Sequence, residues 1–198
     1  AEPKELTAVP LEEAGLPVSV PEELISTLFS PNSVTPCVAC IGVAPTGEVF
    51  AGVDQIGPLG KGGGKGRIIR LVDEDHNGVS DIRTEYALID NPRGIVPVGN
   101  KLYVLHTKWG EGTKFDGMFL SVLEDLDGDG VADGPPRHLV KEISTRKYNQ
   151  SRGVDHTTNG IRMGIDGWIY VAVGDFGFVN ATGTDGKKLT MFGGGIIR

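Results

Sequence analysis

The sequence predicts an all-β protein, and three observations indicate a β-propeller. Short apolar runs with strand-like alternation recur along the 198 residues, separated by turns rich in the chain's 30 glycines. The order of the runs repeats around two acidic loops, which begin at Asp73 and Asp125. Units of about four short strands at a spacing of roughly fifty residues are typical of propeller blades. The chain holds about three such units, fewer than the roughly four to eight of a closed ring, so we expect the rest of a longer protein or other chains to complete it. An irregular all-β sandwich is the alternative.

The chain opens with a segment that is predicted to be an extended arm. Residues 1–21 are rich in proline and glutamate, so we assign the N-terminal portion of the propeller domain to residues 22–198. The first strand pair is expected within residues 41–52, around a Pro-Thr-Gly turn. Residues 57–66 (GPLGKGGGKG) predict a loop. Phosphate binding is not expected there, because the Gly-Lys pair is not followed by Ser or Thr on a helix.

From Arg67 onward the strands follow one another in a repeating order. Further strands are expected at residues 67–72, 83–89, 94–98, 101–105, 118–123 and 138–140, and another unit begins at residues 193–198. A long insertion is expected around residues 144–153. No helical period persists beyond about residue 30, so no helix is predicted there.

A β-hairpin near the end of the chain organises the candidate site. Its strands flank Asp166-Gly167, which fits a two-residue type I′ turn, because both positions of that turn need positive φ. If Ile165 pairs with Trp168 across the turn, the same antiparallel register continued away from the turn places Thr158 opposite Asp175. The residues just beyond this pair should therefore emerge together at the open end of the hairpin.

His156 and Asp175 are the candidate catalytic pair at that open end. A carboxylate in this position can orient an imidazole or stabilise its charge, which prepares the imidazole for general base catalysis. Asp155, beside the histidine, is a further candidate. The alternative is that His156 is a loop histidine and Asp175 forms a turn before Gly177.

Two acidic loops match a calcium-binding pattern, D-x-[DN]-x-[DN]-G-x-x-D. Side-chain oxygens at alternate positions point inward, a backbone carbonyl follows, and the last aspartate closes the cage. The predicted ligands are Asp73, Asp75, Asn77, Val79 and Asp81 in the first loop and Asp125, Asp127, Asp129, Val131 and Asp133 in the second. The loops resemble the calcium loops of integrin-type propeller blades, and they are not EF-hands because the closing glutamate and the flanking helices are missing. We expect Ca²⁺ to stabilise the fold; a polar turn without an ion is the alternative.

The two cysteines form a single Cys-x-x-Cys motif, Cys37 to Cys40. The histidine of a c-type haem attachment does not follow, and a single pair cannot enclose zinc. Superposing the two Gly-containing hairpin turns places Cys40 over Gly160, at the hairpin end that carries His156 in the later unit. Two interpretations remain: the cysteines form a disulfide at that place, or they are two buried thiols.

Net charge and composition limit the classes of binding partner that are expected. The formal net charge is −7 and no Lys/Arg cluster is present, so nucleic acid and anionic membranes are not expected partners. No apolar run approaches the ~20 residues of a membrane span. The acidic residues gather in the two loops, which favours cations instead.

The segment from Asp155 to Gly177, with Asp155-His156, Gly164-x-Asp166-Gly167-Trp168-Ile169-Tyr170 and Gly174-Asp175, resembles the soluble PQQ-dependent sugar (glucose or sorbosone) dehydrogenases. This resemblance implies a six-bladed propeller, export to the periplasm or the extracellular space, and PQQ bound at the central mouth. It implies that His156 is the base and Asp175 its acidic support. The family's cofactor-holding Arg and Lys residues lie on later blades, and Asn91-Pro92-Arg93 stands where a glutamine is expected.

Two hypotheses follow from these patterns. The first is an exported quinoprotein-like dehydrogenase that oxidises a sugar or alcohol by hydride transfer to PQQ. The family resemblance implies cytochrome c as its electron acceptor. The weaker cofactor-binding candidates of this dehydrogenase are Arg93, Asn159 and Arg162. The second is a non-catalytic, calcium-stabilised propeller that serves as a binding or assembly subunit. A calcium-dependent, lactonase-like hydrolase is a third, which would need a carboxylate at the propeller axis.

Overall fold

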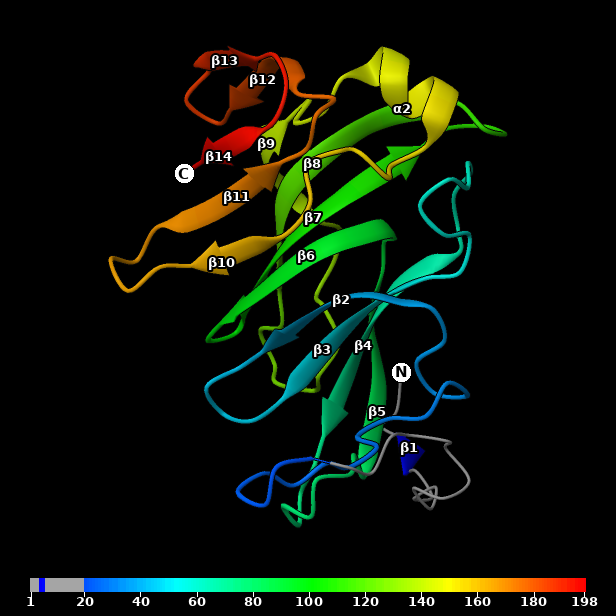
Figure 1. The fold of residues 1–198 in the computed structure, drawn as a ribbon, viewed down its shortest axis with the longest axis vertical. Coiled ribbons are helices and arrows are strands. Elements are labelled where there is room, and N and C mark those ends of the chain that lie inside the picture. Colours follow the sequence, from blue (N-terminus) through cyan, green and yellow to red (C-terminus); the bar gives the residue numbers. More distant parts are fainter. Residues whose placement is uncertain (1–3, 6–19) are drawn as a thin grey trace.

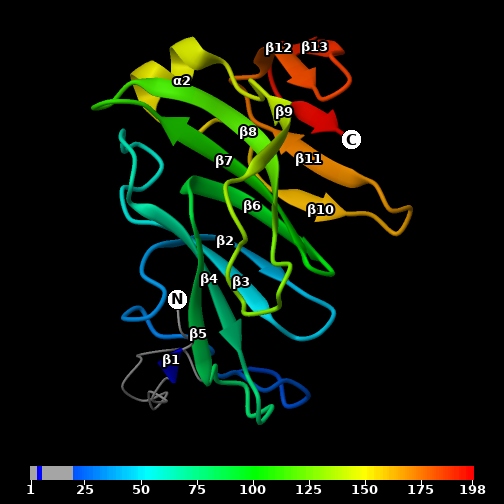
Figure 2. The same cartoon turned by 180° about the vertical axis from the view of Figure 1, so that it is seen from behind.

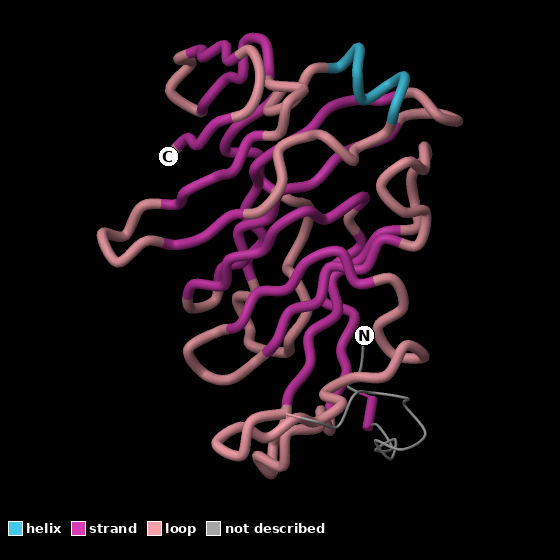
Figure 3. Tube along the Cα trace, in the orientation of Figure 1, coloured by secondary structure: helices cyan, strands magenta, loops and turns pink. Residues whose placement is uncertain are grey.

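Antiparallel strands dominate the described part of the chain. The computed structural model describes residues 4–5 and 20–198. Within this part the strands lie in three sheets that stack along the long axis of the molecule, with one short helix at one end (Figure 1, Figure 3). The predicted all-β class is confirmed.

The first sheet is a four-stranded meander to which a short N-terminal strand is added. Its strands are β1 (Lys4–Glu5), β2 (Val38–Val43), β3 (Val49–Asp54), β4 (Gly66–Val72) and β5 (Ile82–Leu88). Their order is β1-β5-β4-β3-β2, so β2 to β5 follow one another as in a propeller blade. The predicted arm, residues 1–21, lies mostly outside the described residues, and Lys4–Glu5 within it form β1, which pairs with β5.

The second sheet repeats this meander and is then extended. It contains β6 (Asp90–Val98), β7 (Lys101–Trp109), β8 (Phe115–Glu124) and β9 (Arg137–Lys141), followed at its outer edge by β12 (Phe178–Gly183) and β13 (Lys188–Met191). The acidic loops connect β4 to β5 and β8 to β9, which are equivalent places in the two meanders. The repeat predicted from the sequence is therefore present.

The third sheet has three strands, β10 (Ile161–Met163), β11 (Ile169–Val173) and β14 (Gly195–Ile197), fewer than the four expected. The hairpin of β12 and β13 intervenes in the sequence and joins the second sheet instead. One strand from each sheet, namely β2, β6 and β10, lies beside the next in both views (Figures 1 and 2). This arrangement is that of consecutive blades whose inner strands face a common hub.

Two apolar cores fill the spaces between neighbouring blades. The core between the first and second sheets includes Phe50, Ile68, Ile95, Val104 and Leu123, and the core between the second and third includes Leu105, Met118, Ile143, Val171 and Phe178. Because both faces of the second sheet are covered, its strands β7 and β8 are buried almost throughout. The cores hold the inner strands in place around the hub.

One helix was not predicted. Helix α2 spans Arg146–Arg152, inside the insertion expected around residues 144–153. Seven residues are too few to show a helical period. Tertiary contacts hold it instead, since Asn149 is fully buried and its side chain accepts a 2.7 Å hydrogen bond from Ser144. No helix of the described residues is long and apolar enough to cross a membrane.

The register of the β10–β11 hairpin differs by one residue from the prediction. Ile161 pairs with Val171, so the predicted pairing of Ile165 with Trp168 is wrong. Only Gly167 has positive φ in this turn, and its amide donates to the carbonyl of Gly164 at 3.0 Å. The turn is therefore a longer one that ends in a glycine bulge, which a type I′ assignment misses. The open end of the hairpin still falls at the predicted residues.

A buried polar chain crosses the second sheet between β7, β8 and β9. His106 Nδ1 lies 2.9 Å from the carbonyl of Thr107 and therefore donates to it, which leaves Nε2 to accept from the Ser121 hydroxyl at 2.8 Å. Ser121 Oγ in turn accepts from His138 Nδ1 at 2.8 Å. Both ring nitrogens of the neutral, buried His106 therefore have hydrogen-bond partners.

Acid is expected to destabilise the fold through His106. Burial lowers the pKa of His106 from 6.5 to about 4, so the unfolded chain binds this proton first as the pH falls. Stability should be unaffected above about pH 6.5 and should fall by up to about 3 kcal/mol between pH 6.5 and pH 4. The free energy of unfolding, measured with urea at several pH values across this pH range, checks the prediction. The His106→Gln variant should lose this part of the pH dependence, and the exposed control His76→Asn should keep it.

Candidate active site

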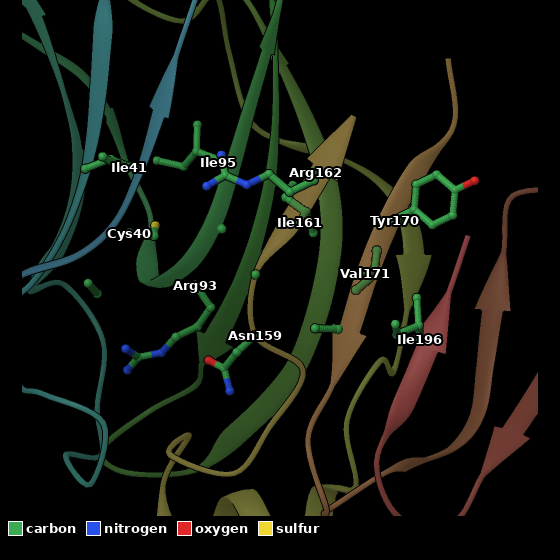
Figure 4. Close-up of a pocket in the computed structure, with 14 residues that line it drawn as sticks. Cys40, Ile41, Arg93, Ile95, Asn159, Ile161, Arg162, Tyr170, Val171 and Ile196 are labelled. Atoms are coloured by element: carbon green, nitrogen blue, oxygen red, sulfur yellow. The ribbon is translucent and has the colours of Figure 1, made fainter. Parts of the chain in front are cut away.

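A cavity of about 570 Å³ opens where the inner strands of the three blades meet (Figure 4). It is lined by residues of β2, β6 and β10 with parts of β11 and β14, among them Cys40, Arg93, Ile95, Asn159, Ile161, Arg162 and Ile196. The predicted cofactor-binding residues Arg93, Asn159 and Arg162 are all among them. Arg93 and Asn159 lie at one end of the cavity, and Arg162 lies farther along β10 (Figure 4).

The candidate pair lies at the open end of the hairpin, as the sequence predicts. His156 Nδ1 and Asp175 Oδ1 are 2.6 Å apart. Because a carboxylate accepts, Nδ1 carries the proton and Nε2 is left unprotonated in the neutral ring. About 44% of the His156 side chain and 66% of the Asp175 side chain are exposed, so solvent and small molecules can reach the pair.

Two turns bring this pair together. The amide of Gly174 donates to the carbonyl of Thr157 at 3.0 Å, and the amide of Gly177 donates to the carbonyl of Gly174 at 3.0 Å, which closes a turn with Asp175 near its centre. A β-carbon on Gly174 would stand 2.3 Å from the carbonyl oxygens of both His156 and Thr157. Only glycine allows the two loops to approach this closely.

Asp155 supports the histidine from the other side. Its Oδ1 accepts a 3.0 Å hydrogen bond from the His156 amide, and its Oδ2 lies 3.5 Å from His156 Nε2. The same carboxylate lies 3.8 Å from the guanidinium of Arg152. The imidazole is thus placed between two carboxylates, one on each ring nitrogen.

Arg93 lines the cavity and is paired with Asp54, a partner that the sequence reasoning missed. Its Nη2 donates to Asp54 Oδ2 at 2.5 Å, and the side chains of Arg93 and Asp54 are only 9% and 2% exposed. Burial lowers the pKa of Arg93, while the nearby carboxylates of Asp54 and Asp155 act in the opposite direction. Asp54 ends the apolar strand β3, and an aspartate at the end of a buried strand is the signal that could have found it.

The buried Asp54 is held by further polar groups. Asn91 Nδ2 donates to both Asp54 oxygens at 3.2 Å, and Asn91 Oδ1 accepts from Thr107 Oγ1 at 2.5 Å and from Trp109 Nε1 at 2.6 Å. This network fixes the start of β6 beneath the cavity. Asn159 is fixed as well, because its Nδ2 donates to the Thr157 carbonyl at 2.8 Å. Arg162 forms no ion pair with the described residues, so its charge remains available to a ligand.

The glycine-rich loop, residues 57–66, packs against the segment that carries the histidine. The amide of Val154 donates to the Pro58 carbonyl at 2.6 Å, and Lys61 Nζ donates to the Ser151 carbonyl at 2.8 Å. These two contacts fix the loop against the segment that precedes His156.

The two cysteines are free thiols in this structure. Cys40 is half-buried and lines the cavity together with Gly160, as the superposed hairpins predict. Cys37 is exposed, so the alternative of two buried thiols is wrong. Burial raises the pKa of the Cys40 thiol to about 12. Cys40 is therefore protonated at neutral pH and is a poor nucleophile.

The acidic loops each gather three carboxylates. Oxygens of Asp73, Asp75 and Asp81 lie within 4.8 Å of one another, as do those of Asp125, Asp127 and Asp133. Asp129 is not part of the second group. Its Oδ1 accepts from the Val131 amide at 2.8 Å, and Asn77 Oδ1 accepts from the Val79 amide at the same distance. The second loop also reaches the first blade, where the Ala132 amide donates to the Tyr86 carbonyl at 2.9 Å.

In comparisons with known proteins, the chain matches one family model. The sequence model of a family described as a domain of unknown function, DUF7133, matches residues 43–198. No match is found among curated proteins. Among solved structures, the chain is similar to a Thermus thermophilus protein described as a proposed oxidoreductase (glucose dehydrogenase), with 18% sequence identity and a TM-score of 0.45. The similarity covers 71% of this chain and 38% of that protein, so the chain spans well under half of that protein's length.

Proposed function

The chain belongs to the DUF7133 family, and from its hub and loop geometry we propose that it forms part of an oxidoreductase that oxidises a sugar or alcohol with His156 as the general base. The observation that carries the proposal is the 2.6 Å contact between His156 Nδ1 and Asp175 Oδ1 at the open end of the β10–β11 hairpin. A neutral ring that donates through Nδ1 carries its lone pair on Nε2, which is the atom that would take a substrate proton. The motif resemblance between Asp155 and Gly177 supports the same assignment.

The residues of the site define the path of a proton. Nε2 of His156 takes the proton of the substrate hydroxyl, and the imidazolium that forms is stabilised by the carboxylates of Asp175 at 2.6 Å and Asp155 at 3.5 Å. The carbon-bound hydrogen then needs an acceptor for a hydride. This requirement is what makes a cofactor part of the proposal.

The proposal places a planar anionic cofactor such as PQQ in the cavity lined by Arg93, Asn159 and Arg162. The walls formed by Ile95 and Ile161 are apolar, and Arg162, which has no ion-pair partner among the described residues, offers a cation for a carboxylate. Arg93 contributes less charge, since Asp54 neutralises it, and serves with Asn159 as a hydrogen-bonding end of the cavity. Bound PQQ supplies a quinone that accepts the hydride.

Reconstitution tests this proposal. The full-length protein is incubated with PQQ, and oxidation of aldoses and alcohols is followed with an artificial electron acceptor. His156→Gln is expected to lower kcat by roughly a hundredfold or more, the range lost with a general base. The control His138→Gln, whose histidine lies in the second sheet, should keep its turnover. Absence of turnover in the wild-type protein, or equal turnover in His156→Gln, would reject the proposal.

The proposal also covers the cellular location of the protein and its partners. It places the protein in the periplasm or the extracellular space, with cytochrome c as the electron acceptor and with further blades, from a longer protein or from other chains, completing the ring. A non-catalytic binding or assembly subunit is the second candidate function, favoured by the exposed apolar side chains of β2, Ile41 and Val43. Turnover after reconstitution decides between the two.

We propose calcium as a structural ion in both acidic loops. Each gathers three carboxylates, which would repel one another without a cation. Removing calcium with a chelator is expected to lower the melting temperature by about 5 °C. Asp133→Asn should abolish the effect of the second loop, while Asp185→Asn, in an exposed turn, should not. A metal analysis that finds no retained calcium would count against both sites.

A further inference from the structure

The hydrogen bond between His156 and Asp175 is too exposed to hold the imidazole by itself. Both side chains lie in contact with solvent, with 44% and 66% of their surfaces exposed, so water competes for the same atoms. An imidazole that rotates about its side chain would lose the distinction between Nδ1 and Nε2. Something buried must fix the plane of the ring if one nitrogen is to remain the base.

Phe176 is the buried group against the imidazole. Only 6% of its surface is exposed, its ring centroid lies 5.5 Å from that of His156, and the two planes are inclined by 20°. Phe176 is not a member of the apolar cores between the sheets, as far as the described residues show. Among the described residues, the aromatic and cationic groups against its ring are His156, Tyr148 and Arg152.

Phe176 is in turn held from several directions. Thr145 Oγ1 donates to its carbonyl at 2.7 Å, and its amide donates to the His156 carbonyl at 3.3 Å. The ring of Tyr148 lies 5.2 Å away, and the guanidinium of Arg152 lies 5.4 Å from the ring centroid. Both come from helix α2, which thereby packs its side chains onto the site.

We propose that Phe176 is a positioning residue, whose ring sets the plane of the His156 imidazole and so keeps Nδ1 on Asp175 and Nε2 facing the substrate. The consequence of this role for catalysis rests on the proposed function. The effect of Phe176 on the imidazole does not, because the tautomer of His156 can be observed without substrate or cofactor. The helix α2, through Tyr148 and Arg152, acts as the support of this ring.

Nitrogen NMR of the histidine rings tests the proposal directly. The chain has four histidines, so labelling with ¹⁵N-histidine gives few signals, and His156→Gln assigns the one of interest. At about pH 8, where ordinary imidazoles are neutral, His156 should show a protonated Nδ1 and an unprotonated Nε2. In Phe176→Leu and Phe176→Met both nitrogens should move toward averaged values, and Phe176→Tyr should restore the wild-type pattern.

A matched control is available in the second sheet, where Phe119 stacks on His138 with centroids 4.0 Å apart. Phe119→Leu should change the signals of His138 and leave those of His156 unchanged. In reconstituted protein, Phe176→Leu should lower kcat by roughly tenfold with KM unchanged, since only proton transfer is affected.

The outcomes separate this inference from the proposed function. Averaged His156 signals in the Phe176 variants support the inference, even if no variant shows turnover, in which case the proposed function alone fails. Wild-type His156 signals in both folded variants, or a wild-type ring protonated at Nε2, would overturn it. If Phe176→Leu does not fold, Phe176→Met, with its closer volume, provides the same test.

Discussion

Replacing Gly174 with alanine is expected to separate the two loops of the site and to abolish catalysis. The added methyl would stand 2.3 Å from the carbonyl oxygens of His156 and Thr157, both of which are backbone atoms that cannot rotate away. The hydrogen bond from the Gly174 amide to Thr157 would be lost, and with it the approach of Asp175 to His156. We expect turnover as low as in His156→Gln and a loss of stability of about 3 kcal/mol, at the upper end for overpacking.

Gly110→Ala is the matched control for this prediction. A β-carbon on Gly110 has its nearest neighbour at 3.7 Å, an ordinary contact distance. Its stability should change by no more than about 0.5 kcal/mol. Urea unfolding followed by tryptophan fluorescence measures both variants. A Gly174→Ala protein with normal stability and turnover would show that the two loops do not need their close approach.

Asp54→Asn is expected to be the most destabilising change of a single charge. It leaves the guanidinium of Arg93, only 9% exposed, without its carboxylate partner in a buried place. Removing one member of a buried ion pair costs about 3 kcal/mol or more, because the remaining charge stays unpaired. The lowered pKa that burial gives Arg93 has the same cause. Equilibrium unfolding at neutral pH provides the measurement.

Two comparisons make this result specific. Asp116→Asn removes a carboxylate that faces Lys108 at 3.2 Å, but these side chains are 44% and 61% exposed, so at most about 0.5 kcal/mol is expected. The double variant Asp54→Asn with Arg93→Gln removes both charges and should recover part of the loss. Equal stability of Asp54→Asn and Asp116→Asn would refute the structural role of the buried pair.

Local chemistry in the sequence predicts much of the fold and of the site. Alternating apolar runs identify β4 to β9, and the spacing of the acidic loops identifies the repeat. The open end of the hairpin predicts the proximity of His156 and Asp175, because it depends on the length of the strands and tolerates a register error of one residue.

The features that the sequence did not predict depend on tertiary contacts. Helix α2 has seven residues and gains its stability from packing. Asp54 pairs with Arg93 across 39 positions of the chain, and a lone aspartate at a strand end does not reveal its partner. Phe176 reads as an ordinary turn residue until its ring is seen against the imidazole of His156.

A double-mutant cycle on His156 and Asp175 tests the central claim most directly, namely that the two residues act as one unit at the open end of the β10–β11 hairpin. In protein reconstituted with PQQ, kcat is measured for His156→Gln, Asp175→Asn and the double variant. We predict that each single change lowers kcat and that the double variant is no slower than His156→Gln, because the carboxylate acts only through the imidazole. Independent, multiplicative losses in the double variant would contradict the account.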